Sequence, residues 1–386
     1  MLGSDPTKTP QLGVPEIEYL RYARETYDDR AGEAVDLASS GTPWLDPAAL
    51  AVLPIELMSV SKPAEFRRAI ARRYGVDPNE VGLARGTSSA LYTTLRAIAG
   101  PGERIVVETP AYEPLWRVPE GLGFEVSTFS RLWEEGYRLD PRRVLDALGP
   151  DGRIVLVADP HNPTGVATDR AVLLEIADAL AKRGGYLLVD ECYRDIELDG
   201  ADLLAAEHAG DALSARPHPT ARQHPAIIAM NSLTKVHGLP WARSGWLLGP
   251  PDLCERAENV GYHVMGHYGY DYAAWGLAAF ARLGTLKSRA ERLQGSKRKT
   301  VERWLDDHES LTWTPSADGL WFGFIRSKNG LNITDFCLRA FTEARVMLAP
   351  GAFFGDPTAF RLAWTAPEQE VAAALTRLDA LLADLL

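Results

Sequence analysis

The sequence has few cysteines. Its 386 residues include only three, Cys192, Cys254 and Cys337, which lie far apart along the chain. An odd number of widely spaced cysteines argues against a disulfide framework, and their spacing matches no zinc-binding motif. A reducing compartment suits such a chain best. We therefore expect a cytoplasmic protein without a metal site.

Long apolar runs and regions of one charge are also missing. No stretch approaches the roughly eighteen apolar residues of a membrane-spanning helix, and the first residues lack the basic and apolar parts of a secretory signal. The 41 basic and 52 acidic residues, which give a net charge of -11, are spread along the chain. The sequence thus predicts neither a membrane-bound protein nor a nucleic-acid partner.

The composition is that of an ordinary globular protein, with 46% hydrophobic and 24% charged residues. A chain of this length exceeds a single hydrophobic core, so two domains are expected. We expect a large domain over residues 46–280. A smaller domain would combine residues 1–45 with residues 281–386.

Short apolar runs alternate with segments of helical periodicity in the first two thirds of the chain. The runs are Arg104–Glu108, Phe124–Phe129, Arg153–Val157, Tyr186–Asp190, Ala226–Met230 and Trp246–Gly249. The clearest helix is predicted over Thr168–Arg183, starting at Thr168. This alternation predicts an α/β fold whose mostly parallel sheet is covered by helices on both faces.

The last third of the chain has a different pattern, and so has its first segment. A basic helical stretch at Ala290–Arg303 precedes strand-like runs at Leu320–Ile325 and Arg345–Leu348, and regularly spaced leucines mark a closing helix. Together with a short helix predicted over Pro15–Tyr27, this pattern indicates a smaller α+β domain.

Polar residues follow three of the predicted strands. Asn162 lies in the loop after Arg153–Val157, Asp190 and Tyr193 follow Tyr186–Val189, and Ser232 and Lys235 follow Ala226–Met230. Ligands in such sheets bind beyond the carboxyl ends of the strands. We expect these loops to converge on one site.

A glycine and hydroxyl residues, Gly86, Thr87 and Ser88, precede another helical pattern. Backbone N–H groups and a positive dipole end at such a helix start can hold a phosphate, whereas a plain Ser/Thr N-cap is the alternative. Gly41 either lets backbone approach a ligand or simply makes a turn. Arg361 is a lone charge in an apolar run, so it forms either a structural salt bridge or a carboxylate clamp.

Several motifs in this order resemble the fold-type I pyridoxal-phosphate enzymes, and within them the class I/II aminotransferases related to aspartate aminotransferase. The resemblance extends from about Asp36 to the C-terminus. It rests on these residues: Gly86-Thr87-Ser88, Tyr112, Asn162-Pro163-Thr164-Gly165, Asp190 with Tyr193, Ser232 with Lys235, Arg243 and Arg361. It implies pyridoxal 5'-phosphate as the cofactor, the PLP-transferase fold type I and a homodimer.

The resemblance also implies roles for these residues. Lys235 would form a Schiff base with the cofactor and then move a proton, and Asp190 would pair with the ring nitrogen. Hydrogen bonds to the ring oxygen would come from Asn162 and Tyr193, and stacking on the ring from Tyr112. The phosphate ligands would be Gly86, Thr87, Ser88, Ser232 and Arg243. The substrate carboxylate would meet Arg361, with Gly41 and Asn162 beside it.

The expected activity is transfer of an amino group between an α-amino acid and a 2-oxo acid in a ping-pong cycle. A carbon–sulfur β-lyase or another carbanion enzyme with the same cofactor is the alternative, and a non-catalytic effector-binding relative is a second one. The sequence departs from the family pattern in three respects: Ile55–Val60 lacks the usual tyrosine, Trp241 stands where glycine is usual, and Ser89 stands where an acidic residue is often seen. Tyr19, Tyr22, Trp44, Tyr112, Tyr268 and Tyr270 are candidates for lining a side-chain pocket.

Overall fold

The computed structural model describes residues 15–23, 25, 34–46, 62–197, 220, 222–266, 271–294 and 296–383. Two sequence features lie wholly outside this part of the chain: Ile55–Val60, and the pair Tyr268 and Tyr270.

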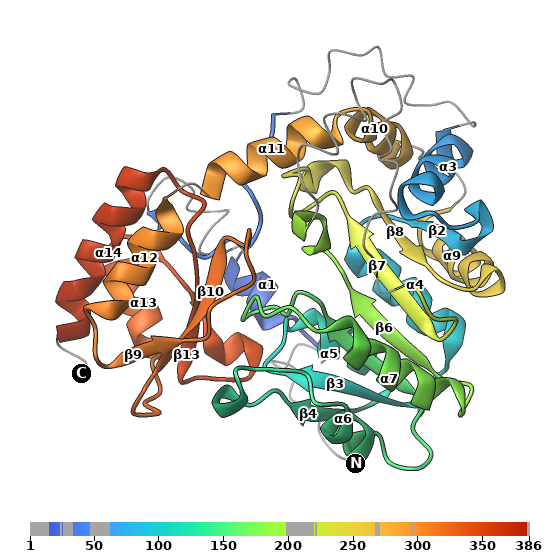
Figure 1. Ribbon diagram of the computed structural model, residues 1–386, viewed down its shortest axis with the longest axis horizontal. Helices are drawn as coiled ribbons and strands as arrows, with labels where there is room; N and C mark the ends of the chain where they lie inside the picture. The colour runs from blue at the N-terminus through green and yellow to red at the C-terminus, as the bar shows by residue number, and fades with distance from the viewer. Residues whose placement is uncertain are drawn as a thin grey trace, which may run out of the picture.

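A seven-stranded sheet forms the larger layer of the molecule, with strand order β2-β8-β7-β6-β5-β3-β4 (Figure 1). Neighbouring strands from β4 to β7 run parallel, whereas β8 is antiparallel to both β7 and β2. The strands are β2 (Val81–Ala84), β3 (Arg104–Thr109), β4 (Glu125–Ser130), β5 (Ile154–Ala158), β6 (Tyr186–Asp190), β7 (Ile227–Ser232) and β8 (Gly245–Leu248). The predicted mostly parallel sheet is confirmed.

Helices cover both faces of this sheet because alternate residues of its strands point to opposite sides. In β5, Leu156 packs toward α4 (Thr87–Ile98), α5 (Pro114–Gly121) and α9 (Pro251–Met265). Its neighbours Val155 and Val157 pack on the other face, where α6 (Pro141–Leu148) and α7 (Arg170–Ala181) lie. A third core joins α3 (Lys62–Tyr74) and α10 (Asp271–Phe280) to β2, β7 and β8.

A four-stranded antiparallel sheet, of order β12-β13-β10-β9, lies on the other side of the molecule with α12, α13 and α14 (Figure 1). Its strands are β9 (Leu311–Trp313), β10 (Phe322–Ser327), β12 (Ala349–Pro350) and β13 (Ala359–Ala363). The helices are α12 (Lys297–Asp306), α13 (Thr334–Thr342) and α14 (Glu368–Ala383). Their apolar side chains share one core with this sheet.

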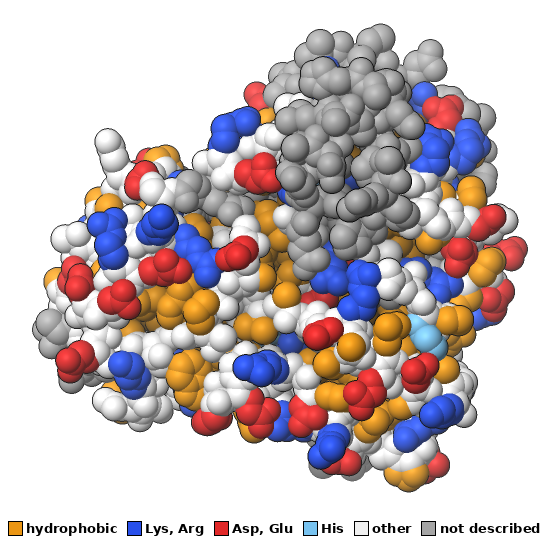
Figure 2. All heavy atoms as spheres, in the orientation of Figure 1, with side chains coloured by type: hydrophobic (Ala, Val, Ile, Leu, Met, Phe, Trp, Pro, Cys, Tyr) orange, Lys and Arg blue, Asp and Glu red, His pale blue; other side chains and the backbone are white. Residues whose placement is uncertain are grey.

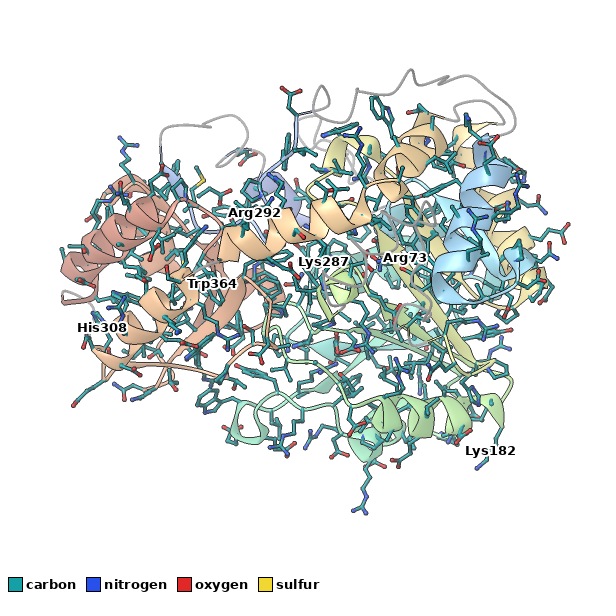
Figure 3. All side chains as sticks on the ribbon, turned by 45° about the horizontal axis from the view of Figure 1, so that its top comes forward. Arg73, Lys182, Lys287, Arg292, His308 and Trp364 are labelled. Carbon is teal, nitrogen blue, oxygen red and sulfur yellow. The ribbon has the colours of Figure 1, made fainter. Side chains whose placement is uncertain are left out.

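Two segments connect the sides of the molecule. Strand β1 (Val35–Asp36) pairs in parallel with β11 (Val346–Met347), so the N-terminal part of the chain packs with its last third. Helix α11 (Leu283–Gln294), which carries Lys287 and Arg292, crosses from α10 toward α12 (Figures 1 and 3). Among the described helices, none combines the length and apolar composition that crossing a membrane requires.

Several predicted boundaries were wrong. Helix α7 is capped by Asp169, whose side chain accepts from Ala171 N, because Thr168 Oγ1 instead accepts from the Arg131 guanidinium at 3.4 Å. The stretch Ala290–Arg303 contains the end of α11 and the start of α12 rather than one helix. The first helix, α1 (Glu18–Ala23), begins three residues after Pro15 because the Glu113 carboxylate accepts from Glu18 N and Tyr19 N there.

Candidate active site

The sheet brings the predicted site residues to one edge. Strands β5, β6 and β7 are neighbours, with Ala158 opposite Asp190 and Asp190 opposite Met230, so the loops with Asn162 and Lys235 start side by side. On the far side of β7, Ser232 lies opposite Gly245, and Gly245 lies opposite Ala84. This antiparallel pairing places the start of α4 and the Arg243 loop at the same edge.

Two hollows meet at Tyr112. The larger cavity, of about 760 Å³, is bordered by Lys235, Gly41 and Tyr19. A smaller hollow is bordered by Thr87, Ser88 and Asp190. Because Tyr112 borders both, it lies between the residues predicted to hold the phosphate and those predicted to meet the substrate. Trp44 also borders the larger cavity, whereas Tyr22 does not.

Burial makes Lys235 a better nucleophile than an ordinary lysine. Its Nζ donates to Ser40 Oγ at 3.4 Å. Removal from water lowers its pKa, and the charges of Arg361 and Arg243 act in the same direction, so more of the amine is unprotonated near neutral pH. An unprotonated amine is the form that attacks a carbonyl group.

Asp190 lies buried in the site, where its Oδ1 accepts from Cys192 N at 3.0 Å. Burial raises its pKa, which the Cys192 N–H and the charge of Lys235 only partly oppose. No described lysine, arginine or histidine forms an ion pair with this carboxylate. A ligand carrying a positive charge would balance the negative charge of this carboxylate.

The hydroxyl group of Tyr193 is also buried. The side chain is 1% exposed, and within the described residues its Oη has no well-aligned hydrogen-bond partner. Buried hydroxyls in folded proteins nearly always have one, so a polar atom of a bound group is the natural partner. Asn162, the other residue expected at the ring oxygen, accepts with its Oδ1 from Arg361 Nη1 at 2.8 Å.

The start of α4 forms an anion cradle with the Arg243 loop. Gly86 precedes the helix with φ +81°, and a Cβ atom there would lie 2.5 Å from Arg243 Nη2. Thr87 Oγ1 donates to Ser232 Oγ at 3.1 Å, so hydroxyls from two elements meet. Arg243 donates only to the carbonyl oxygens of Pro240 and Arg85, and no described carboxylate pairs with it. These groups fit a phosphate.

Arg361 is held by neutral groups in a buried position. Its Nη2 donates to Tyr19 Oη at 2.8 Å and to Ala38 O at 2.9 Å. The rings of Tyr19, Phe322 and Phe354 lie within 5.7 Å of its Cζ. Gly41 borders the cavity beside Lys235, but a Cβ atom there would lie 3.8 Å from the Lys235 side chain. That is an ordinary contact, so the protein by itself does not require glycine at this position.

A buried polar network centred on Asp195 was not predicted from the sequence. Asp195 Oδ2 lies 2.6 Å from His237 Nε2 and 3.2 Å from Arg73 Nη2, and its Oδ1 accepts from Asn231 Nδ2 at 3.1 Å. Arg73 comes from α3, and its side chain points into the interior (Figure 3). The only signal in the sequence was that His237 lies two residues after Lys235.

The unusual Trp241 has a clear structural role. Its indole Nε1 donates to Leu45 O at 2.8 Å, and its ring packs edge-on against Trp275 at 4.8 Å. Leu45 N in turn donates to Gly238 O. Trp241 thus attaches the segment with Ser40 and Gly41 to the loop that carries Lys235.

Comparison with known proteins agrees with this geometry. The chain is 25% identical over 341 residues to an aspartate aminotransferase of Streptomyces avermitilis, covering 83% of this chain and 80% of that protein. It is 25% identical over 385 residues to the capreomycidine synthase of Streptomyces vinaceus, covering 98% and 95%.

Among solved structures, a PLP-dependent aminotransferase from Streptococcus suis superposes with a TM-score of 0.80 at 20% identity, covering 97% of this chain and 99% of that one. Its fold confirms the predicted fold class. Residues 57–378 match the sequence profile described as aminotransferase class I and II. The chain therefore belongs to the class I and II aminotransferase family.

Proposed function

We propose that the chain is a pyridoxal-phosphate-dependent aminotransferase that moves an amino group between an α-amino acid and a 2-oxo acid at the site around Lys235. One observation carries the proposal. A lysine with a lowered pKa, a buried carboxylate that pairs with no described cation, and a helix start beside a guanidinium that pairs with no described carboxylate share one sheet edge. Pyridoxal phosphate would supply an aldehyde to the lysine, a positive ring nitrogen to the carboxylate, and a phosphate to the helix start and the guanidinium.

Each part of the cofactor has a matching group in the chain. When bound, pyridoxal phosphate supplies an aldehyde for a lysine amine and a ring that takes up electrons from the substrate Cα. Asp190 would hold the positive ring nitrogen, and Tyr193 with Asn162 would donate to the ring oxygen. Tyr112 would stack on the ring. The phosphate would lie against the N–H groups after Gly86, the hydroxyls of Thr87, Ser88 and Ser232, and the Arg243 guanidinium.

Lys235 would work first as nucleophile and then as acid and base. With the cofactor bound, Lys235 Nζ would accept the proton from the substrate Cα and later give it back. Arg361 and Asn162 would orient the substrate carboxylate, with Gly41 at the same wall. Release of the first 2-oxo acid before the second binds then gives the ping-pong cycle.

Replacement of Lys235 tests the proposal. Lys235→Ala should lose transaminase turnover and the visible absorbance of lysine-bound cofactor, because Lys235 is the only lysine among the described residues that border the cavity. Lys182→Ala, which removes an exposed lysine at the end of α7, is the matched control and should retain both properties (Figure 3). Wild-type turnover in Lys235→Ala would refute the assignment.

A second candidate is another carbanion reaction of the same cofactor, including carbon–sulfur β-elimination. It is favoured by one observation: a relative named as a synthase, capreomycidine synthase, aligns with 98% of the chain. Adding an amino acid without a 2-oxo acid separates the two. Accumulation of the pyridoxamine form with release of a 2-oxo acid indicates transfer, whereas ammonia and pyruvate without that form indicate elimination.

Three further properties belong to this proposal. We assign residues 46–280 to a cofactor-binding domain and residues 1–45 with 281–386 to a second one. The protein is a homodimer, which light scattering would test. Its location is the cytoplasm, which suits its three buried, unpaired thiols. Charges of both signs alternate over the face in Figure 2, which agrees with small-molecule substrates rather than nucleic acid.

A further inference from the structure

Ser40 brings a buried hydroxyl group to the reacting end of Lys235. Its Oγ accepts from Lys235 Nζ at 3.4 Å, and the residue borders the same cavity as the lysine. Ser40 is only 5% exposed. None of the proposed cofactor and substrate contacts uses this hydroxyl. A hydroxyl within hydrogen-bonding distance of the catalytic amine is nevertheless placed to take part in the reaction.

The segment that carries Ser40 is fixed to the main chain of Lys235. Thr42 donates to Lys235 O with both its backbone N and its Oγ1, each at 3.1 Å. A Cβ atom on Gly41 would lie 3.8 Å from Lys235 Cδ, so the segment runs along the lysine side chain. Because these contacts join the two segments on either side of the cavity wall, Ser40 is kept beside the end of the lysine side chain.

Trp321 holds the backbone of Ser40. Its indole Nε1 donates to Ser40 O at 3.0 Å, and the tryptophan is 0% exposed. The ring of Trp321 also meets the ring of Tyr193 edge-on, with 6.3 Å between the ring centres. Tyr193 in turn approaches the Ser40 side chain with its hydroxyl. The Ser40 hydroxyl thus has two neighbours, the catalytic amine and a phenol expected at the cofactor ring.

We propose that Ser40 is a further catalytic residue, whose hydroxyl oxygen holds Lys235 Nζ in position to take the proton from the substrate Cα. The inference rests on the aminotransferase function proposed above. A neutral amine has two N–H bonds and one lone pair. When one N–H donates to Ser40 Oγ, the amine at the end of its flexible stem is held in one orientation and its lone pair can face the cavity. The lone pair takes the proton, the electron pair of the C–H bond stays with the substrate carbon, and Ser40 keeps its own proton.

The test compares Ser40→Ala with Ser39→Ala, which removes the neighbouring hydroxyl on the border of the same cavity. Each cofactor-loaded protein is mixed with the amino acid that reacts fastest with wild type in a panel of the common L-amino acids. The rate at which the pyridoxamine form appears is then followed by absorbance. Ser40→Ala should react about tenfold more slowly, because one hydrogen bond that orients the amine is lost. Ser39→Ala should react at the wild-type rate.

A kinetic isotope effect distinguishes slower proton transfer from poorer binding. With the amino acid deuterated at Cα, Ser40→Ala should show an isotope effect on this rate at least as large as that of wild type, because proton transfer is the slowed step. Slower substrate binding would instead reduce the isotope effect. The dissociation constants of the amino acid and of the cofactor should stay within about twofold of wild type.

The contact itself is measured without substrate, in protein freed of the cofactor. The pKa of the Lys235 amine should fall in Ser40→Ala, because the ammonium form loses a hydrogen-bond acceptor, and should not change in Ser39→Ala. The pH dependence of reductive methylation of Lys235 by formaldehyde, followed by peptide mass spectrometry, gives this pKa. Other groups that act on the amine are the same in both variants: Cys192, Arg361, Asp190 and Arg243.

The possible failures can be told apart. If wild type is converted to the pyridoxamine form and Ser40→Ala is converted at the same rate, the hydroxyl has no catalytic role and the inference is overturned. An equal loss of rate in Ser39→Ala and Ser40→Ala would overturn it as well, because the effect would not depend on the contact with Lys235. If wild-type protein loaded with the cofactor reacts with no amino acid of the panel, the proposed function itself fails, and the inference fails with it.

Discussion

The carboxylate of Asp195 accepts a hydrogen bond from His237 Nε2 at 2.6 Å, and both side chains are only 1% exposed. Arg73 and Asn231 approach the same carboxylate. These contacts join α3, the turn after β6 and the end of β7 to the loop that carries Lys235. The position of Lys235 therefore depends on groups that have no contact with the cavity.

Removal of the Asp195 carboxylate should destabilise the protein strongly. Asp195→Ala leaves buried polar and charged groups without their shared partner, which costs about 3–5 kcal/mol of unfolding free energy. Asp252→Ala, which breaks an exposed pair with Arg256, should cost under about 1 kcal/mol. Urea unfolding of the two variants measures the difference. Equal losses would mean that the buried network contributes no more than a surface pair.

Asp190→Asn should have opposite effects on stability and on cofactor binding. Without the cofactor, Asp190 is a buried carboxylate that forms no ion pair with a described lysine, arginine or histidine, so the neutral amide should raise the melting temperature of the apoprotein by about 2 °C. Cofactor affinity and turnover should fall, because the ring nitrogen loses its counter-charge. Thermal melting and cofactor titration give the two readings. A lower melting temperature of the apoprotein would contradict this account.

Glu108 should make the stability of the protein depend on pH. Burial raises its pKa to about 7, although Arg131 Nε donates to it at 2.7 Å and Ala158 N at 2.6 Å. In the unfolded chain its pKa is near 4.5. The folded protein thus binds this proton more tightly, and stability falls as pH rises from about 4.5 through about 7.

Glu108→Gln should flatten this part of the pH profile. Glutamine resembles the protonated acid, so the variant's melting temperature should fall less than that of wild type between pH 5 and pH 8. Glu103→Gln, which changes an exposed partner of Arg153, is the control and should keep the wild-type slope. Equal slopes in wild type and Glu108→Gln would show that Glu108 does not change its protonation state between pH 5 and pH 8.

Trp241→Gly should restore the residue usual in the family and yet weaken this protein. The change removes the hydrogen bond to Leu45 and the contact with Trp275. Because the side chain is only half-buried, the loss should lie near or below the lower end of about 3–5 kcal/mol for Trp→Ala in cores. KM should also rise, since the segment with Ser40 and Gly41 loses an anchor. Trp241→Phe keeps an aromatic ring against Trp275 but removes the hydrogen bond to Leu45. Comparison of the two variants should therefore separate the contribution of the ring contact from that of the hydrogen bond.

The site residues were predictable where they follow sheet strands. Asn162, Asp190 and Lys235 follow apolar runs, and the carboxyl ends of neighbouring parallel strands lie at one edge by geometry alone. Tyr19 was predicted only as a candidate for lining a side-chain pocket, without its contact to Arg361, and Asp195 was not assigned to the site. No local pattern reports a contact between Tyr19 and Arg361, which are 342 residues apart, because that contact depends on how α1 packs across the molecule.

The sequence by itself determined the alternation of strands and helices, the family and the identity of the groups that suit a phosphate, a ring nitrogen and an aldehyde. The spacing of hydrophobic residues and the residues at helix starts encode these features, so they can be predicted without a three-dimensional structure. Tertiary structure alone decided which groups are buried and which face the cavity. Burial lowers the pKa of Lys235 and raises that of Asp190, and packing brings Tyr19 into contact with Arg361. Such effects depend on desolvation and long-range packing, which arise only when distant segments meet.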